Sequence, residues 1–332
     1  MEKEWKNTLF AYVNQYNQCE IDFRPQAKES VIADLDVLLE RGSRMERLQQ
    51  WYREREAVPL RCETRARLSK LVLDTPEEAC VDVSLYIRLF YEKRGMNHRE
   101  ERMEQERLTF TRDGGQWAVT RIERSVPERG LSAGAYPFEP AETVHAHNLP
   151  LLNRKVTGPA SRSRNARYRR EEAVDYADRW WNSSNPEFEA FEVDCTNYIS
   201  QCLFAGGGPI HYTGRRESGW WYKGLAAGRE LWSYSWAVSN SLQRYLDSST
   251  WGLRAEQVER PEQLALGDVI FYDWDGDGTF QHSTIVTAFD AGGMPLVNAH
   301  TVSSRHRYWD YKDSYAWNDA TVYRFYHIAD QF

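Results

Sequence analysis

A stretch near the middle of the chain, residues 126–166, most constrains how this protein can fold. It shows no helical or strand periodicity and is interrupted by the prolines and glycines Pro127, Gly130, Gly134, Pro137, Pro140, Pro150, Gly158 and Pro159. Long structureless segments inside a compact domain are uncommon. The chain of 332 residues is also longer than one core usually supports. The sequence therefore predicts an N-terminal domain at 1–125, a linker or wrapping segment at 126–166 and a C-terminal domain at 167–332.

The N-terminal domain begins with helical periodicity and then changes to strand periodicity. Apolar residues recur at helical spacing over 4–16 and, less regularly, over 26–56. Residues 65–73 and 81–91 alternate, and the turn Asp113-Gly114-Gly115 joins 108–112 to 116–122 as a hairpin. The segment 97–107 is compatible with either a strand or a helix. This order predicts a small α+β domain, whose outline is similar to a cystatin-like or NTF2-like fold.

The C-terminal domain also places helices before strands. Helical patterns cover 168–181, 195–203 and 237–246, and strand patterns cover 269–272, 282–289, 296–300 and 321–328. We therefore expect an α+β domain whose N-terminal helices pack on an antiparallel sheet.

Composition excludes several classes of protein. The net charge of −7 argues against a nucleic-acid binder, and no apolar run is long enough for a membrane span. The charged start, residues 1–6, lacks the apolar core of a signal peptide, which predicts a cytoplasmic protein. The five cysteines form no CxxC pair, so we expect reduced thiols and neither a disulfide framework nor a metal site.

Cys195 is the first candidate for chemistry. It follows Asp194 at the start of the helical pattern 195–203, which the glycine run 206–208 ends. A thiol at a helix N-terminus lies beside unpaired N–H groups and the positive end of the helix dipole, and both lower its pKa. The alternative is a small buried apolar residue, which is the expectation for Cys202 two turns later. Asp194 is expected to be an N-cap or structural acid.

A cysteine hydrolase also needs a base and a group that orients it. His282 opens a predicted strand, and Asn298 lies on the next strand beyond the turn at 291–293. Hairpin neighbours can place 282 and 298 side by side, so Asn298 is the candidate orienting residue and His300 its rival. The backbone N–H of Cys195 is a candidate donor to an oxyanion.

Taken together, these pieces resemble the bacterial putative amidase domain, a relative of NlpC-type and CHAP-type cysteine peptidases. The resemblance covers 168–328 and rests on the segments 173–177, 194–201 (Asp-Cys-Thr-Asn-Tyr-Ile-Ser-Gln), 266–270 (Leu-Gly-Asp-Val-Ile), 282–286 and 298–301. It implies a papain-like fold and a triad of Cys195, His282 and Asn298. It also implies a thioester mechanism without cofactor or metal, and peptide or peptidoglycan-fragment substrates. The alternative is a domain of the same fold that binds a peptide or glycan without cutting it. The sequence does not indicate an oligomeric state.

Two further features have open interpretations. The chain holds 13 tryptophans, and Trp220, Trp221 and Trp236 are candidates to line a substrate groove or, equally, to form a core. The acidic segment 273–281 copies the start of a calcium loop but lacks the glutamate at its twelfth position, where Thr284 stands. A tight acidic connection between strands is the favoured interpretation there, and a weak cation site is the alternative.

Overall fold

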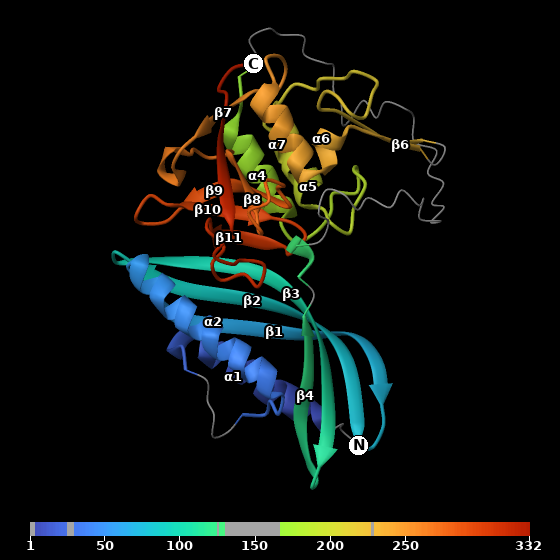
Figure 1. Cartoon of the computed structure of the whole chain (residues 1–332), viewed down its shortest axis with the longest axis vertical. Helices are drawn as coiled ribbons and strands as arrows, with labels where there is room; N and C mark the ends of the chain where they lie inside the picture. Colours follow the sequence, from blue (N-terminus) through green and yellow to red (C-terminus); the bar gives the residue numbers. More distant parts are fainter. Residues whose placement is uncertain (1–3, 25–29, 125, 130–166, 227–228) are drawn as a thin grey trace. The chain divides into compact units, whose positions relative to one another are not determined.

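The computed structural model describes residues 4–24, 30–124, 126–129, 167–226 and 229–332, and the chain divides into two compact units (Figure 1). The N-terminal unit comprises Met1–Val126 together with Asp290–Gly292 and Asp310–Tyr315. The C-terminal unit comprises Pro127–Phe289, Gly293–Trp309 and Ala316–Phe332. Most of the predicted linker at 126–166 lies outside the described residues. Both units mix helices with antiparallel strands, which confirms the predicted α+β class in its general form.

The N-terminal unit packs two helices against a four-stranded antiparallel sheet of order β1-β2-β3-β4 (Figure 1). Its elements are α1 (Trp5–Asp22), α2 (Leu35–Glu54), β1 (Ala57–Asp74), β2 (Glu78–Lys93), β3 (Met96–Asp113) and β4 (Gln116–Arg124). The Asp34 carboxylate starts α2 by accepting the N–H of Val37 at 3.2 Å. The β3–β4 hairpin is confirmed. The segment 97–107 is a strand: it pairs with β2, in which every second residue is buried, and it extends the antiparallel ladder of this sheet.

A buried ion network ties this unit together. The Arg102 guanidinium on β3 contacts Glu20 of α1 at 3.5 Å, Glu104 at 2.7 Å and Asp313 at 2.8 Å. Arg44 of α2 also pairs with Glu20. The neighbouring guanidinium groups lower the pKa of Glu20 despite its burial. Loss of one partner would leave the remaining buried charges uncompensated and destabilise the fold. Through these ion pairs the network links both helices to the sheet.

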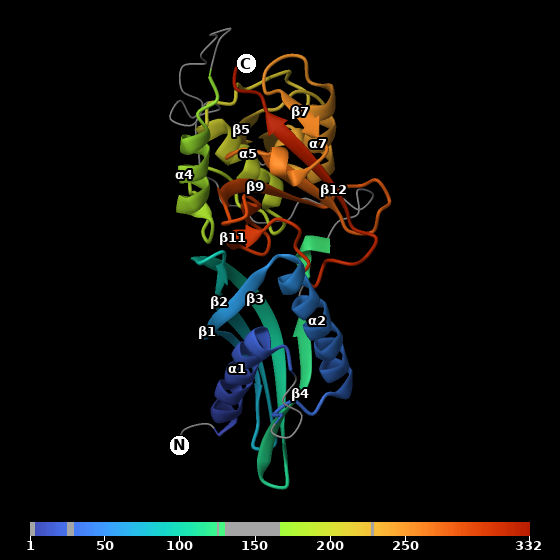
Figure 2. The same cartoon turned by 90° about the vertical axis from the view of Figure 1, so that its left-hand side faces the viewer.

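The C-terminal unit is built on a six-stranded antiparallel sheet of order β11-β10-β9-β8-β12-β7. Its strands are β7 (Ala255–Val258), β8 (Val269–Asp273), β9 (His282–Phe289), β10 (Pro295–Ala299), β11 (Ser304–Tyr308) and β12 (Val322–Ile328), with a separate pair β5 (Tyr222–Ala226) and β6 (Arg229–Trp232). Its helices are α4 (Arg170–Trp180), α5 (Cys195–Ala205), α6 (Tyr234–Ala237) and α7 (Ser239–Ser248), with the short 3-10 turns η1 (Pro127–Arg129) and η2 (Pro261–Gln263). Figure 2 shows α4, α5 and α7 gathered on the sheet.

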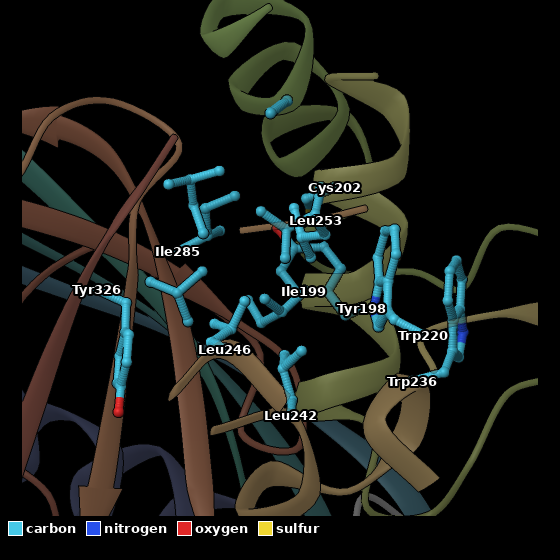
Figure 3. Packing of buried hydrophobic residues seen from close by; sticks show 14 of the residues in the cluster. Tyr198, Ile199, Cys202, Trp220, Trp236, Leu242, Leu246, Leu253, Ile285 and Tyr326 are labelled. Carbon is cyan, nitrogen blue, oxygen red and sulfur yellow. The ribbon is translucent and has the colours of Figure 1, made fainter. Parts of the chain in front are cut away.

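The core of this unit lies between α5 and the sheet. Ile199 and Cys202 of α5 point toward Ile285 of β9 and Leu246 of α7 (Figure 3). All four side chains expose 2% or less of their surface, which confirms the prediction that Cys202 belongs to the core. This packing fixes α5 against β9 and therefore sets where the first residue of α5, Cys195, is held.

The Gly267-Asp268 step anchors the start of α4 to the sheet. Gly267 adopts φ +79°, and a Cβ there would lie 2.7 Å from the Tyr168 hydroxyl, so only glycine fits. The buried Asp268 carboxylate accepts from Arg170 at 2.6 Å and contacts His327 Nδ1 at 2.7 Å. The hydrogen bond from His327 to Asp268 raises the pKa of His327 above its usual value.

This contact predicts a pH-dependent contribution to stability. A histidine whose folded pKa is raised stabilises the fold fully below its unfolded pKa of about 6.5, and this contribution is lost as pH rises through the folded pKa. In His327→Gln the contribution is absent at every pH. We therefore expect wild type to melt about 2 °C above His327→Gln at pH 5.5 and at the same temperature at pH 9. A difference in Tm that is equal at both pH values, measured by calorimetry, would contradict the assignment.

None of the helices in the described part of the chain combines the length and apolarity needed to cross a bilayer. The five cysteines are all free thiols in the structure.

Candidate functional site

Helix α5 presents Cys195 as its first residue. Asp194 occupies the N-cap position, but its carboxylate makes no cap bond to the helix backbone. Instead it accepts the N–H of Phe191 at 3.1 Å and the Asn197 side-chain amide at 2.8 Å. Asp194 is thus a structural acid that closes the loop before the helix, as the sequence predicted.

The Cys195 thiol lies against the first residues of β9. Its Sγ is 4.0 Å from the carbonyl oxygen of Gln281 and 3.7 Å from the Thr196 hydroxyl. The Thr196 hydroxyl in turn lies 3.1 Å from the Ser283 hydroxyl. The residues on either side of His282 therefore face α5, the helix that begins at Cys195.

Burial dominates the electrostatics of this thiol. Cys195 exposes only 3% of its surface. Desolvation raises the pKa of the thiol, and hydrogen bonds from Thr196, Ser283 and Thr301 offset only part of that rise. The expectation of a lowered pKa at the helix N-terminus is wrong for this conformation, because loss of hydration outweighs the helix dipole. The sulfur is held here as a neutral thiol.

The His282 imidazole points to the other face of the sheet. Successive side chains of a strand point to opposite faces, and the neighbouring Ser283 faces α5. The His282 ring lies 5.5 Å from the Tyr272 ring and 5.9 Å from the Trp274 ring, centroid to centroid. Burial, aided by the positive charge of Arg307, lowers the pKa of His282 to about 3. A neutral imidazole has the protonation state of a base, yet in this conformation it faces away from the helix that carries Cys195.

The register of β9 and β10 corrects one prediction. Asn298 pairs with Ile285, whereas His282 pairs with Tyr272 of β8. Cross-strand partners share a face, so Asn298 lies on the α5 face with Ile285. The expected side-by-side placement of His282 and Asn298 is therefore wrong, because it assumed a register displaced by three residues.

Asn298 instead joins β10 to α4 and to β11. Its amide nitrogen donates to Asp178 at 2.9 Å, and its amide oxygen accepts from the Thr287 hydroxyl at 2.8 Å and from the His306 N–H at 2.9 Å. Hydrogen bonds from His306, Arg305 and Asn298 lower the pKa of Asp178 against its desolvation. These contacts use both atoms of the Asn298 amide, so it supports the hairpin rather than orienting His282.

His300 contacts Asp194, the residue that precedes Cys195. Its Nδ1 lies 2.8 Å from the Asp194 carboxylate and its Nε2 lies 2.7 Å from the carbonyl oxygen of Trp180. Its ring also stacks on Tyr198 at 4.0 Å. Both ring nitrogens of His300 therefore face acceptor oxygens. His300 therefore links the end of β10 to the start of α5 through its contact with Asp194.

The three tryptophans predicted to line a groove are interior residues. Trp220 and Trp236 expose none of their surface and Trp221 exposes 3%. Trp220 donates to Ser200 at 3.0 Å, and Trp236 donates to Asn197 at 2.9 Å. The predicted groove is wrong for these residues, because all three rings are buried. Trp220 and Trp236 belong to the core cluster beside α5, as the alternative of a tryptophan-rich core expected, whereas Trp221 donates to the carbonyl oxygens of Arg215 and Ser218.

The acidic segment 273–281 is a turn closed on itself. The Asp273 carboxylate accepts the N–H groups of Gly276 and Gly278, each at 2.8 Å. Asp277 accepts the N–H of Thr279 at 2.7 Å. Within the residues that the structure describes, no group of three His, Cys, Asp or Glu side chains is arranged to hold a metal ion. The favoured interpretation of a tight acidic connection agrees with these bonds.

We expect calcium to leave the melting temperature of the protein unchanged, because Asp273 already accepts backbone N–H groups. Asp273→Ala is expected to cost about 1–3 kcal/mol, since it removes the buried carboxylate that accepts the N–H groups of Gly276 and Gly278. The matched control Asp277→Ala removes an exposed carboxylate and should cost much less. A rise in Tm with calcium that Asp273→Ala abolishes would show that the segment binds the ion after all.

The comparisons with known proteins give one family match, which lies in the C-terminal part of the chain. Residues 167–326 match the family described as a putative amidase domain. The chain is 35% identical over 303 residues to the uncharacterized protein YhbB of Bacillus subtilis. The aligned region covers 91% of this chain and 89% of that protein. No solved structure matches, so the likeness of the N-terminal unit to cystatin-like or NTF2-like folds stays a prediction.

Proposed function

The chain and the uncharacterized protein YhbB belong to the same family, and residues 167–326 match the family described as a putative amidase domain. From this premise we propose that the protein is a cysteine-dependent amide hydrolase with Cys195 as nucleophile. The observation that carries the proposal is the position of Cys195 at the start of α5, packed against the segment of β9 that begins at His282. A nucleophile helix lying on an antiparallel sheet also supports a papain-like fold.

The proposed reaction proceeds through a thioester. The Cys195 sulfur attacks the carbonyl carbon of the amide as its proton passes to a base, and the C=O electron pair moves to the oxygen. Collapse of this intermediate breaks the C–N bond, and the amine leaves with the proton. Water then attacks the thioester and releases the acid and the thiol. We propose peptide amides, including those of peptidoglycan fragments, as the substrate class.

His282 is the base that this proposal uses. In this conformation burial lowers the pKa of the ring to about 3, which keeps it neutral but makes it a weak base, so the proposal requires that pKa to rise when the ring leaves its buried surroundings. Proton transfer needs the imidazole within hydrogen-bonding reach of the sulfur. The proposal therefore includes a rearrangement at the first residues of β9 that brings the ring to the α5 face. The β8–β9 ladder ends at the pair Tyr272 and His282, so such a change involves few strand bonds.

The second candidate function is a binding module that holds a peptide or glycan without cutting it. Two observations favour it: the Cys195 thiol has a raised pKa, and the His282 ring faces the other side of the sheet. A silent domain would keep both features with ligand bound, whereas an enzyme has to change them during turnover.

Trapping of the acyl-enzyme distinguishes the two functions. The full chain is incubated with a panel of N-acyl amino acid amides, peptides and peptidoglycan muropeptides, with and without hydroxylamine. Hydroxylamine attacks a thioester and gives a hydroxamate, so an enzyme yields acid in water and hydroxamate in its presence. Binding of a muropeptide by calorimetry with neither product from any substrate would overturn the hydrolase and support the binding module.

A further inference from the structure

Arg41 is a buried cation of the N-terminal unit that faces aromatic rings instead of carboxylates. It lies on α2 and exposes only 6% of its surface. Its guanidinium carbon lies 5.0 Å from the centre of the Tyr12 ring and 5.9 Å from the centre of the Tyr16 ring, both on α1. Among the residues that the structure describes, Arg41 forms no ion pair, and its buried Nη2 has no hydrogen-bond partner. Its charge is therefore removed from water without a carboxylate in direct contact.

Arg124, the last residue of β4, shows the arrangement that a buried charge normally requires. Its guanidinium pairs with Glu106 at 2.9 Å and with Glu40 at 3.0 Å. Tyr12 links the two arginines, because Arg41 packs over its ring while its hydroxyl donates to Glu106 at 2.6 Å. A tyrosine ring attracts a cation but brings no net negative charge. Arg41 thus lacks the counter-charge that normally accompanies a buried guanidinium.

Three guanidinium groups of this unit gather around Tyr315. The guanidinium carbon of Arg124 lies 4.6 Å from the centre of the Tyr315 ring, and that of Arg44 lies 5.1 Å from it. The Arg41 guanidinium interacts electrostatically with the same tyrosine and is repelled by the charge of Arg124. Within the described part of the chain, Nη2 of Arg124 and Nε of Arg44 are also buried without a hydrogen-bond partner. All three arginines therefore hold N–H donors that the described residues leave unused.

These donors match one class of ligand. A guanidinium presents its N–H groups in a planar fork that fits two oxygens of a carboxylate or of a phosphate. Such an oxyanion would also supply the negative charge that Arg41 lacks, and the attraction between the two charges is strong where water is excluded.

We propose that Arg41 and Arg124 bind a small oxyanion, a carboxylate or a phosphate group, beside Tyr315. The site lies within the N-terminal unit. The proposal therefore does not depend on amide hydrolysis by the C-terminal unit, and its test uses no measurement of activity.

The alternative is a purely structural arginine, held by its contacts with Tyr12 and Tyr16 alone. The variant Arg41→Met separates the two roles, because methionine keeps much of the apolar volume and removes the charge. Loss of a structural cation–π contact lowers the melting temperature whatever anion is present. Loss of a charge without a counter-ion costs no stability in chloride, but it removes the stabilisation that a bound oxyanion gives.

The experiment follows the melting temperature of the full chain by calorimetry at pH 7 in a cationic buffer. Sodium chloride is replaced stepwise by sodium phosphate or by sodium acetate at constant ionic strength, so the two arms distinguish a phosphate from a carboxylate. Wild type, Arg41→Met and Arg107→Met are compared. Arg107, an exposed arginine on β3 of the same unit, provides the matched control. Isothermal titration of wild type with each anion measures binding directly and does not require that Arg41→Met fold.

We expect one of the two anions to raise the melting temperature of wild type and of Arg107→Met by about 4–8 °C at roughly ten times its dissociation constant. Arg41→Met should show no such rise and should melt no lower than wild type in chloride. An equal rise in Arg41→Met would overturn the site. So would the absence of saturable heat from wild type with both anions, or an Arg41→Met that melts below wild type by the same amount in every anion.

Discussion

Replacement of Cys195 by alanine is expected to lower the rate of amide hydrolysis by at least about 10⁴-fold, because the covalent route loses its nucleophile. The substitution removes one buried sulfur, while Thr301 Oγ1 still accepts the backbone N–H groups of residues 194 and 195 and the Thr196 hydroxyl still contacts the Ser283 hydroxyl. The melting temperature should therefore stay close to that of wild type. The measurement is the initial rate on the substrate that gives hydroxamate, per mole of folded protein.

Cys202→Ala is the matched control for this prediction. Cys202 lies on the same helix two turns later, is fully buried, and belongs to the core cluster rather than to the contacts with Gln281 and Thr196 that surround Cys195. Its replacement should leave the rate per folded molecule unchanged and lower stability modestly by opening a small cavity. If Cys195→Ala kept more than about one hundredth of the wild-type rate, covalent catalysis by Cys195 would be ruled out.

The largest expected loss of stability follows from Arg102→Met. Arg102 is buried on β3 and pairs with Glu20, Glu104 and Asp313. Removing one member of a buried ion network costs about 3–5 kcal/mol, because the remaining charges stay desolvated with fewer counter-ions. We expect the urea midpoint of the N-terminal unit to fall accordingly in the full chain, followed by circular dichroism.

Arg107→Met on the same strand is the control. Arg107 forms a two-bond pair with Asp82 at 2.7 and 3.1 Å, but its side chain is exposed. Exposed pairs contribute little because water screens both charges. Equal losses in the two variants would contradict the claim that burial of the network, rather than pairing itself, determines its importance.

The periodicity of apolar residues in the sequence was sufficient to predict most of the helices and strands. The hairpin around Gly114 and Gly115 was predictable because tight hairpin turns require positive φ, which glycine adopts readily, and because alternating segments flank the two glycines. Both glycines have positive φ in the structure. The helix at 195–203 was equally clear, since its apolar positions all enter one core. The short strands β5, β6, β7 and β11 were not predicted, because four- or five-residue segments carry too few alternations to stand out.

The site was less predictable than the fold because it depends on register. Sequence spacing suggested that His282 and Asn298 are neighbours, yet the ladder pairs Asn298 with Ile285. A strand residue changes face with every step, so an error of three residues moves a side chain to the opposite side of the sheet. The contacts of Thr301 and His300 with Asp194 were also beyond sequence reasoning, because each joins residues more than a hundred positions apart.

Burial explains the other difference between expectation and structure. The position of Cys195 at a helix N-terminus suggested a lowered pKa, but the site is closed and desolvation dominates. The same closure places Trp220 and Trp236 inside rather than along a groove. An aromatic-rich sequence does not indicate which rings face solvent, since tryptophan serves cores and binding surfaces equally well.

The central claim is that Cys195 is the activated nucleophile of this protein, and peptide-level alkylation of wild type and His282→Ala with iodoacetamide at pH 7 tests it most directly. If the claim is correct, Cys195 reacts faster than the buried thiols of Cys62 and Cys202. His282→Ala slows Cys195 alone, because the reactive conformation is the proposed one in which the His282 ring lies on the α5 face. A Cys195 that reacts no faster than those buried thiols, or whose rate is the same in His282→Ala, would contradict it.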